Sequence, residues 1–271
     1  MVLSRASWPE VDLSHAAADG PVAFSAGIGP DELLAAYRVG AYPLPASGDI
    51  ARTINEVSYE DEVAAERIWL VGEDAGDPYS VSWWSPDPRP VLPVRGVHLS
   101  RRLARQLRRV DWTTSLDREF ERVVRECQVG RDPQWLTDDL VRSLLLLHQR
   151  GWAHSVEVWQ DTTLVGGVFG VRLGDVLSLD SMFRRRSGAA SVAVADLADR
   201  FAQVGGAVLD AQWDSPHVRD LGATPLPRER YLKLLADQRP DPSPLPADPR
   251  PVRRLADGTA DSSDAADAAE G

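Results

Sequence analysis

A run of two tryptophans and two prolines, Ser82 to Arg89, restricts the fold of this chain more than any other stretch. Proline lacks a backbone N–H and has a fixed φ, so the run fits neither a helix interior nor a central strand. In a strand that leads into such a turn, Trp83 and Trp84 point to opposite faces. One ring can then pack in a core while the other faces a cleft, where it can stack on a nucleobase. The alternative is that both rings are core.

The chain length and its single cysteine limit the class of protein. The 271 residues suffice for one large domain or two small ones. Cys127 alone excludes an internal disulfide or a cysteine-based zinc site, which suits a reducing cytosol. No apolar run approaches the roughly 20 residues that span a bilayer, and the N-terminus has no signal pattern. We expect a cytoplasmic protein with no membrane partner.

The net charge of −11 is concentrated in two segments. Residues 44–80 carry nine acids and two bases, and residues 239–271 carry seven acids and four bases. We expect an acidic surface insertion at 46–80 and a disordered tail at 239–271. The remainder is close to neutral, so a local basic patch can still meet a phosphate backbone.

Hydrophobic periodicity predicts helices first and then strands. The helical segments are expected at residues 30–38, 99–110, 116–128 and 137–149. From residue 151 an alternating pattern predicts an antiparallel meander of strands at 153–159, 164–171 and 176–183. A helix at 191–204, a strand at 208–212 and a final helix at 228–238 follow. This order predicts an α+β fold with a parallel strand pair across the helix crossover.

One predicted helix is strongly basic. Leu99, Leu103 and Leu107 form its apolar stripe, and no acid occurs in the run. Its arginines either form an ordinary solvated face or contact phosphates. They are Arg101, Arg102, Arg105, Arg108 and Arg109.

Polar residues at the strand ends near the crossover are candidates for chemistry, because sheets of this kind open their clefts there. Asp180 ends the third strand, and Asp210 and Gln212 end the fourth. Two residues apart, Asp210 and Gln212 share a face of a regular strand. A carboxylate there can orient an amine or accept its proton, and an amide can hold a carbonyl. Alternatively, both only satisfy loop backbone.

A short loop offers a second interpretation. Arg185, Gly188 and Ala190, just before the predicted helix, match the loop with which GNAT acetyltransferases hold a pyrophosphate at a helix N-terminus. This match suggests an N-acyltransferase that uses acyl-CoA. Trp135, in a loop with Gly130 and Pro133, faces either a cleft or the core.

Taken together, these motifs resemble the leucyl/phenylalanyl-tRNA–protein transferase family over about residues 20–238. The most specific matches are the double-tryptophan run and the strand that contains His154-Ser155-Val156-Glu157-Val158-Trp159. The others, in order, are Asp31 to Arg38 with Gly40 and Pro43, His98-Leu99-Ser100, Trp135, Leu164 to Gly167, Ser181-Met182-Phe183, Asp210 with Gln212, Leu221-Gly222-Ala223, Pro227-Arg228 and Tyr231.

The resemblance implies a small N-terminal domain, residues 1–95, and a GNAT-like domain, residues 96–238. It implies transfer of Leu, Phe or sometimes Met from aminoacyl-tRNA to proteins that begin with Arg or Lys, which marks them for degradation. It implies no metal and no CoA. A noncatalytic module that binds aminoacyl-tRNA or N-terminal peptides is a further alternative.

The resemblance also implies roles for single residues. Trp84 and Trp135 would hold the terminal adenosine of the tRNA, the basic helix would meet the acceptor stem, and Asp210 with Gln212 would position the amine and the ester carbonyl. The pocket for the amino-acid side chain would be lined by Met182, Val168, Leu177, Val194, Leu197 and Leu209.

This chain departs from the family pattern in that pocket. Leu177, Leu179 and Asp180 replace the usual aromatic residue, glycine and glutamate. We therefore expect the selectivity for the transferred amino acid to differ from that of the family first, and the activity second.

Overall fold

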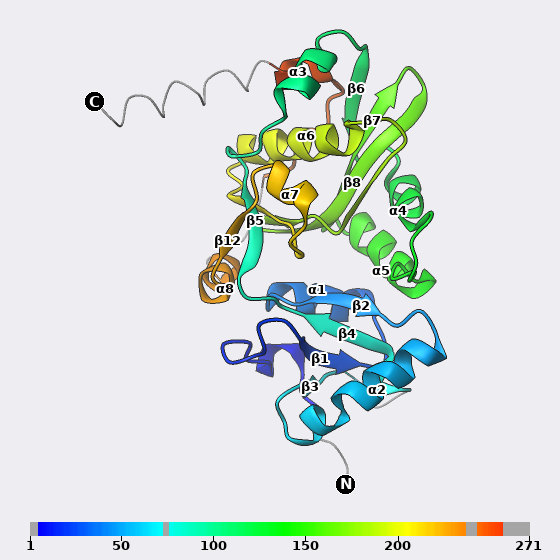
Figure 1. The fold of residues 1–271 in the computed structure, drawn as a ribbon, viewed down its shortest axis with the longest axis vertical. Helices are drawn as coiled ribbons and strands as arrows, with labels where there is room; N and C mark the ends of the chain where they lie inside the picture. The colour runs from blue at the N-terminus through cyan, green and yellow to red at the C-terminus, as the bar shows by residue number, and fades with distance from the viewer. Residues whose placement is uncertain (1–4, 73–75, 237–242, 257–271) are drawn as a thin grey trace, which may run out of the picture.

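The computed structural model describes residues 5–72, 76–236 and 243–256, which form an α+β fold. A four-stranded sheet and a nine-stranded sheet lie one above the other, with helices against both (Figure 1). The α+β class expected from the sequence is confirmed.

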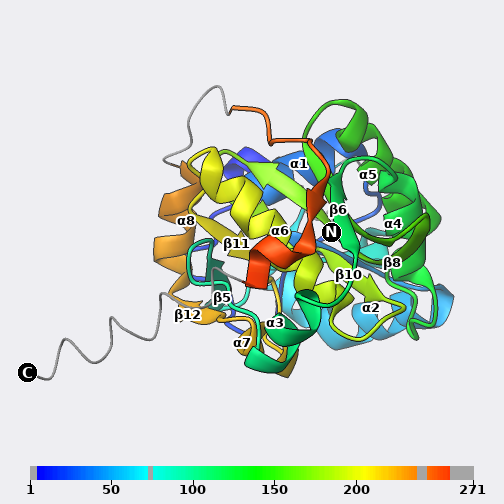
Figure 2. The same cartoon turned by 90° about the horizontal axis from the view of Figure 1, so that it is seen from above.

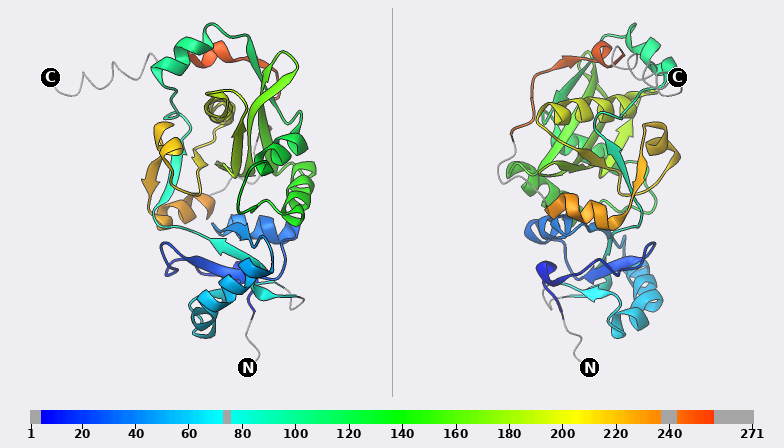
Figure 3. Two further views of the ribbon diagram at one scale, coloured as in Figure 1. Left: turned by 45° about the vertical axis from the view of Figure 1, so that its right-hand side comes forward. Right: turned by 90° about the vertical axis from the view of Figure 1, so that its left-hand side faces the viewer.

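The smaller sheet is formed near the N-terminus, in the order β2-β4-β1-β3. Its strands are β1 (Pro21–Ser25), β2 (Tyr42–Pro45), β3 (Trp69–Leu70) and β4 (Val81–Trp84). The helices of this region are η1 (Trp8–Glu10), α1 (Pro30–Arg38), α2 (Asp49–Ala64) and η2 (Pro78–Ser80). Helix α1 lies between the two sheets, as the two views of Figure 3 show.

The tryptophan and proline run connects the two sheets. Trp83 and Trp84 end β4 in the smaller sheet, and Arg89 begins β5 (Arg89–Pro93) in the larger one. The boundary expected at residue 95 would place β5 with the N-terminal strands. Instead β5 pairs with β11 (Val208–Asp210) and β12 (Thr224–Leu226).

The larger sheet has the order β12-β5-β11-β9-β8-β7-β6-β13, with β10 also paired to β8. Its remaining strands are β6 (Trp112–Leu116), β7 (Ala153–Gln160), β8 (Thr163–Leu173), β9 (Val176–Ser178), β10 (Ser181–Arg184) and β13 (Arg250–Pro251). The expected meander is present, and β11 runs parallel to β9 across the crossover helix α6 (Ala189–Gln203).

Helices cover both faces of the larger sheet. Its other helices are α3 (Arg101–Leu107), α4 (Phe120–Gln128), α5 (Asp138–Gln149), α7 (Pro216–Asp220), α8 (Arg228–Ala236) and η3 (Val252–Ala256). Side chains alternate along β8, so Phe169 packs with α4 and α5, whereas Val168 packs with α6. Among the described helices, none is long and apolar enough to cross a membrane.

The structure differs from three expectations about local structure. The third strand of the meander is interrupted after Ser178 and continues as β10 at Ser181. The helix expected at 116–128 begins only at Phe120, because β6 occupies the residues before it. The acidic segment 46–80 is more than a surface insertion: Val63, Ile68, Leu70 and Tyr79 pack with Phe24 in a small core, whereas the acidic side of α2 stays exposed.

Of the tail expected to be disordered, 239–271, residues 243–256 are ordered, and residues 239–242 and 257–271 lie outside the described part of the chain. It pairs with β6 through β13 and places η3 beside α6 and α3 (Figure 2). Leu245, Val252 and Ala256 are buried there. The cause of the error is physical: acid and proline content alone predicted a solvated chain, but these three apolar residues find a surface left open by the sheet.

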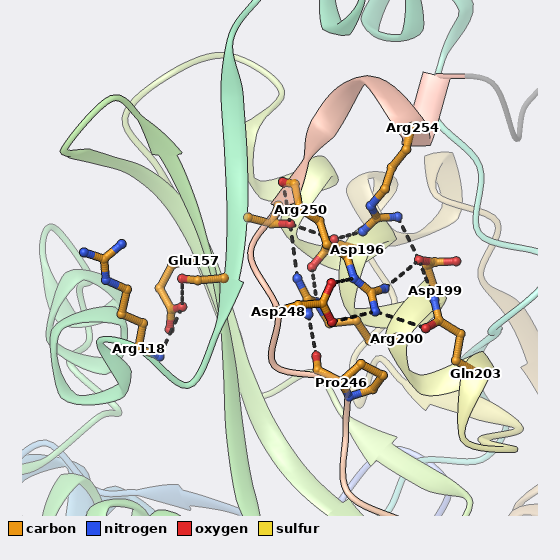
Figure 4. A network of polar contacts seen from close by, with 12 residues as sticks. Arg118, Glu157, Asp196, Asp199, Arg200, Gln203, Pro246, Asp248, Arg250 and Arg254 are labelled. Atoms are coloured by element: carbon orange, nitrogen blue, oxygen red, sulfur yellow. Dashed lines mark hydrogen bonds and ion pairs between the residues drawn. The ribbon is translucent and has the colours of Figure 1, made fainter.

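Ion pairs also attach this segment to α6. Asp196, which is fully buried, accepts hydrogen bonds from Arg200 and Arg254 (Figure 4). Asp199 accepts from Arg250 and Arg254 as well. Buried charges are tolerated only when they are paired, so the C-terminal segment completes the environment of Asp196.

Candidate active site

The strands separate at the carboxyl ends of β9 and β11. β11 pairs with β9 up to Asp210 and Ser178, but beyond that point β10 pairs with β8. The strand β11 ends there because Gln212 adopts a left-handed conformation with φ of 60°. The expected regular-strand relation between Asp210 and Gln212 is therefore wrong, and Gln212 turns toward Asp180 instead.

The carboxylate of Asp210 is buried and fully used by the protein. Arg89 donates to both of its oxygens through Nε and Nη2, each at 2.8 Å. Tyr231 Oη donates to Oδ2 at 2.8 Å, and the backbone N–H of Gln212 donates to Oδ1 at 2.9 Å. These four bonds occupy the roughly four acceptor positions of a carboxylate. Asp210 therefore shapes the site and holds Gln212, but it has no position left for a substrate amine.

Arg89 is held as firmly as its partner. Its side chain is 1% exposed, and its guanidinium lies 4.7 Å from the ring centres of both Tyr42 and Tyr231. The two aromatic faces and the carboxylate replace part of the water that this cation loses on burial, and within the described residues its Nη1 has no hydrogen-bond partner. The last residue of the tryptophan and proline run thus anchors the candidate site.

Asp180 is the acid that faces the open space. Tyr37 Oη donates to its Oδ2 at 2.8 Å, and Gln212 Nε2 donates to its Oδ1 at 2.6 Å. Burial raises the pKa of the Asp180 carboxyl to about 6, and the charge of Asp210 acts in the same direction. Hydrogen bonds from Ser178, Tyr37 and Gln212 oppose this rise in pKa. A carboxyl with such a pKa can exchange protons near neutral pH.

A cavity of about 460 Å³ opens beside these groups, between the two sheets. It combines apolar and aromatic surface with a few polar groups, as small-molecule sites generally do. Its lining residues include Asp180, Gln212, Met182, Leu179, Trp135, Trp213, Tyr42, Leu44, Arg131 and His217.

The residues expected to line an amino-acid pocket fall into two groups. Met182 is half-buried and lines the cavity. The other five are fully buried in the core around α6 and do not line it: Val168, Leu177, Val194, Leu197 and Leu209. Leu179 lines the cavity in addition to Met182.

The tryptophans take distinct positions. Trp83 is fully buried, donates to Ser25 and packs edge-on against Trp8, as expected for the core ring of the pair. Trp84 is half-buried and reaches the cavity indirectly, through an edge contact with Trp213 at 6.2 Å. Trp135 and Trp213 line the cavity directly, and Trp213 is 57% exposed.

The arginines of the basic helix are all exposed. Arg102 lines a second, smaller cavity, and Arg108 donates to the carbonyl of Ala256. Arg185, expected to help hold a pyrophosphate, instead pairs with Glu126 and does not line the cavity that contains Gly188 and Ala190. Arg101, Arg105 and Arg109 line neither of these cavities.

Sequence reasoning missed several cavity residues. Tyr42 comes from the region before the acidic segment, as does Tyr37, which reaches the site through its hydrogen bond to Asp180, and Trp213 and His217 follow the last predicted strand. The signal for Trp213 was its place directly after Gln212, at the end of the strand predicted over 208–212. Within the described residues, no cluster of three or more His, Cys, Asp or Glu side chains has the geometry of a metal site.

Comparison with known proteins identifies a family. The family described as leucyl/phenylalanyl-tRNA protein transferase matches residues 91–236. The protein of that name from Xanthomonas campestris pv. campestris (strain B100) is 36% identical over 230 residues, which covers 83% of this chain and 80% of the relative. The protein of the same name from Syntrophotalea carbinolica is 35% identical over 240 residues, which covers 86% of this chain and 90% of the relative.

Among solved structures, a conserved protein of unknown function from Bacteroides thetaiotaomicron VPI-5482 has a TM-score of 0.38. It shares 12% identity and covers 70% of this chain and 72% of its own, a similarity too low to bear on the fold. The sequence relatives, in contrast, match over most of their length. The chain belongs to the leucyl/phenylalanyl-tRNA–protein transferase family.

Proposed function

We propose that this enzyme transfers an aminoacyl group from aminoacyl-tRNA to the α-amine of a protein that begins with Arg or Lys. The observation that carries the proposal is the pairing of Asp180 with Gln212 at a cavity between separated strands. Membership of the family supplies the two substrate classes, aminoacyl-tRNA and protein. The reaction marks its product for degradation and takes place in the cytoplasm, where aminoacyl-tRNA is made.

The chemistry is aminolysis of an ester that tRNA charging has already activated. The amine nitrogen bonds to the ester carbonyl carbon, and the bond from that carbon to the ribose oxygen breaks. The Asp180 carboxylate takes the proton that the amine loses and returns it to the ribose oxygen. Because the ester is reactive, holding the two reactants in place supplies much of the remaining acceleration.

Gln212 acts directly on Asp180, whereas Asp210 acts through other residues. Gln212 holds the Asp180 carboxylate and presents its amide to the cavity. Asp210 is a positioning residue, because it acts through the backbone of Gln212 and through Arg89. In this assignment Asp180 transfers the proton, and Asp210 is a buried residue that holds the site in place.

The cavity walls suit the two parts of an aminoacyl-adenosine. Trp135 and Trp213 offer faces for the adenine, with Trp84 supporting Trp213. Met182 and Leu179 contact the amino-acid side chain, and the five buried residues behind them set the shape of that wall through packing. The exposed arginines of α3 meet the acceptor stem.

The arrangement of the larger sheet supports a GNAT-like catalytic domain. The parallel strands β9 and β11 are connected through the crossover helix α6 and separate beyond Asp210, which creates the open strand end where the reactants meet. The smaller sheet and its helices form the N-terminal domain, which contributes Tyr37 from α1 and Tyr42 from β2 to the site.

The test is a transfer assay with a peptide that begins with Arg and tRNA charged separately with Leu, Phe or Met. We expect mass spectrometry to detect one added residue on this peptide. The control peptide is identical except for an acetylated N-terminus, which removes the attacking amine. The control variant is Gln212→Ala, which removes the amide that holds Asp180. Addition to the acetylated peptide, or no addition from any charged tRNA, would contradict the proposal.

The alternative acyl-CoA reaction is tested in the same assay. The sequence feature that supported this reaction was the loop with Arg185. In the structure Arg185 pairs with Glu126 instead of lining the cavity at that loop. We expect no acylation of the peptide when acyl-CoA replaces aminoacyl-tRNA. A purely binding role predicts tRNA affinity without any added residue.

A further inference from the structure

A second cavity lies beside the candidate active site and has a different character. Its volume is about 260 Å³, and it lies between α3 and the N-terminus of α6. His217 lines both this cavity and the larger one, so the two adjoin. The lining is mostly polar: Ser100, Arg102, Gln106, Arg184, Ser187, Ser191 and His217, with Leu103, Gly188 and Ala190.

Two arginines from separate elements meet at this cavity. Arg102 comes from α3 and Arg184 from the end of β10. Within the described part of the chain, neither has an ion pair, whereas the neighbouring Arg185 pairs with Glu126. No acidic residue lines the cavity. Both arginines are exposed, so an anion that enters the cavity can reach two cations that no acid of the lining neutralises.

The backbone adds further donors. Helix α6 has 15 residues, no acid in its first turn and no side-chain cap. The N–H of Ala189 donates to the carbonyl of Arg186, whereas within the described residues the N–H groups of Ala190 and Ser191 have no acceptor. Ala190 and Ser191 of this turn line the cavity. Gly188 keeps α3 close, because a Cβ there would lie 2.5 Å from a methyl carbon of Leu103, and its φ of 84° also disfavours a side chain.

His217 supplies an observation that is independent of the helix. Its Nε2 is buried, and within the described part of the chain it has no hydrogen-bond partner. Burial and the charge of Arg184 both lower the pKa of its imidazole. A buried polar atom without a partner is rare unless a ligand or water completes it.

We propose that this second cavity binds the phosphate that joins the last two nucleotides of the aminoacyl-tRNA, with Arg102 and Arg184 as its cationic ligands. The inference rests on the proposed function, because the terminal adenosine must occupy the larger cavity. Because the two cavities adjoin at His217, we place the phosphate on the 5′ side of that adenosine beyond this shared wall. It receives charge-assisted hydrogen bonds from the guanidinium groups and further ones from the α6 N-terminus.

Two minimal substrates separate phosphate binding from catalysis. One is 3′-phenylalanyl-adenosine, which lacks the phosphate, and the other is the same compound extended by cytidine through a 3′,5′-phosphate. For the unmodified enzyme we expect the KM of the dinucleotide to be lower by about tenfold or more, as expected for hydrogen bonds to a charged group. Transfer from phenylalanyl-adenosine by itself tests the proposed function.

The variants are Arg184→Ala, Arg184→Lys and Arg102→Ala, with Arg186→Ala as the matched control. Arg186 is an exposed arginine two residues away that lines neither cavity. We expect the alanine variants to lose the advantage of the dinucleotide while they keep their KM for phenylalanyl-adenosine. Arg184→Lys should retain part of the advantage, and Arg186→Ala all of it.

Several results would overturn this inference while leaving the proposed function intact. One is equal KM values for the two substrates in the unmodified enzyme. Another is an equal loss in Arg186→Ala, which would indicate general charge attraction. A third is competition by free CoA that depends on Arg184 without any dinucleotide advantage, which would assign the cavity to a pyrophosphate instead.

Discussion

Replacing Asp180 with Asn separates the chemical role of this residue from its structural one. The two side chains have nearly the same shape, so the amide can keep a hydrogen bond with Tyr37 or Gln212. It cannot accept a proton near neutral pH. Since general acid–base catalysis typically contributes about 10²- to 10⁴-fold, we expect kcat/KM for transfer to fall by that factor.

The pH dependence provides a second measurement of the same residue. With a pKa of about 6, the Asp180 carboxyl of the free enzyme is mostly ionised at pH 7 and mostly protonated at pH 5. We therefore expect kcat/KM to fall steeply as the pH drops through about 6, in addition to the fall caused by protonation of the substrate amine, whose pKa is about 8. In Asp180→Asn only the second fall should remain.

Stability should change in the opposite direction to activity. The raised pKa means that the folded protein binds this proton more tightly than the unfolded chain, so the stabilisation is present below about pH 4 and is lost as the pH rises through about 6. The shift of roughly two pH units corresponds to at most about 3 kcal/mol. After the cost of a weakened hydrogen bond, about 1 kcal/mol, we expect the Asn variant to be more stable at pH 7.

The assay is transfer of Phe to a peptide with N-terminal Arg from about pH 5 to about pH 8, with uncatalysed ester hydrolysis subtracted. Thermal unfolding of both proteins at pH 7 accompanies it. Near-normal activity of the Asn variant, or an inflection near pH 6 that persists in it, would refute the assignment of proton transfer to Asp180.

Four further changes test other parts of the structure. Asp210→Ala leaves Arg89 buried without its partner, so we expect unfolding measurements to show a loss of about 3–5 kcal/mol, with partial recovery in Arg89→Met/Asp210→Leu; wild-type stability in the single variant would contradict this. Trp213→Ala should raise the KM for phenylalanyl-adenosine about tenfold, given a stacking energy of about 1–3 kcal/mol, without changing the unfolding temperature. Leu179→Ala should enlarge the cavity and shift the ratio of kcat/KM values toward Phe over Leu; an unchanged ratio would remove Leu179 from the pocket. Arg254→Ala removes one of two guanidinium partners of a buried carboxylate and should cost about 1–3 kcal/mol in unfolding experiments while KM stays constant.

Local sequence determined most of the elements. Helix α1 begins at Pro30 with two acids in its first turn, and Thr137 caps α5, both as the residue types predict. The strands of the meander follow their alternating pattern. Such features depend on neighbours a few residues apart, and these neighbours are visible in one sequence. The motif order likewise indicated the family, which the relatives confirmed.

The tertiary structure decided which of the candidate residues can act. Asp180 and Asp210 look equivalent as acids at strand ends, yet contacts from Arg89 and Tyr231, 121 and 21 residues away, occupy Asp210 completely. Asp180 instead meets Tyr37, 143 residues away, at an open cavity. Burial and long-range hydrogen bonds set the protonation of a carboxyl, and neither can be calculated from its neighbours in the chain.

The C-terminal segment illustrates the same limit. Its acids and prolines predicted disorder, and a single sequence contains no sign that Val252 and Ala256 fit against α3 and α6. Whether apolar residues are buried depends on the surface that the rest of the fold leaves uncovered. Composition therefore determined the charge of this segment, but only the assembled sheet and helices determined where it lies.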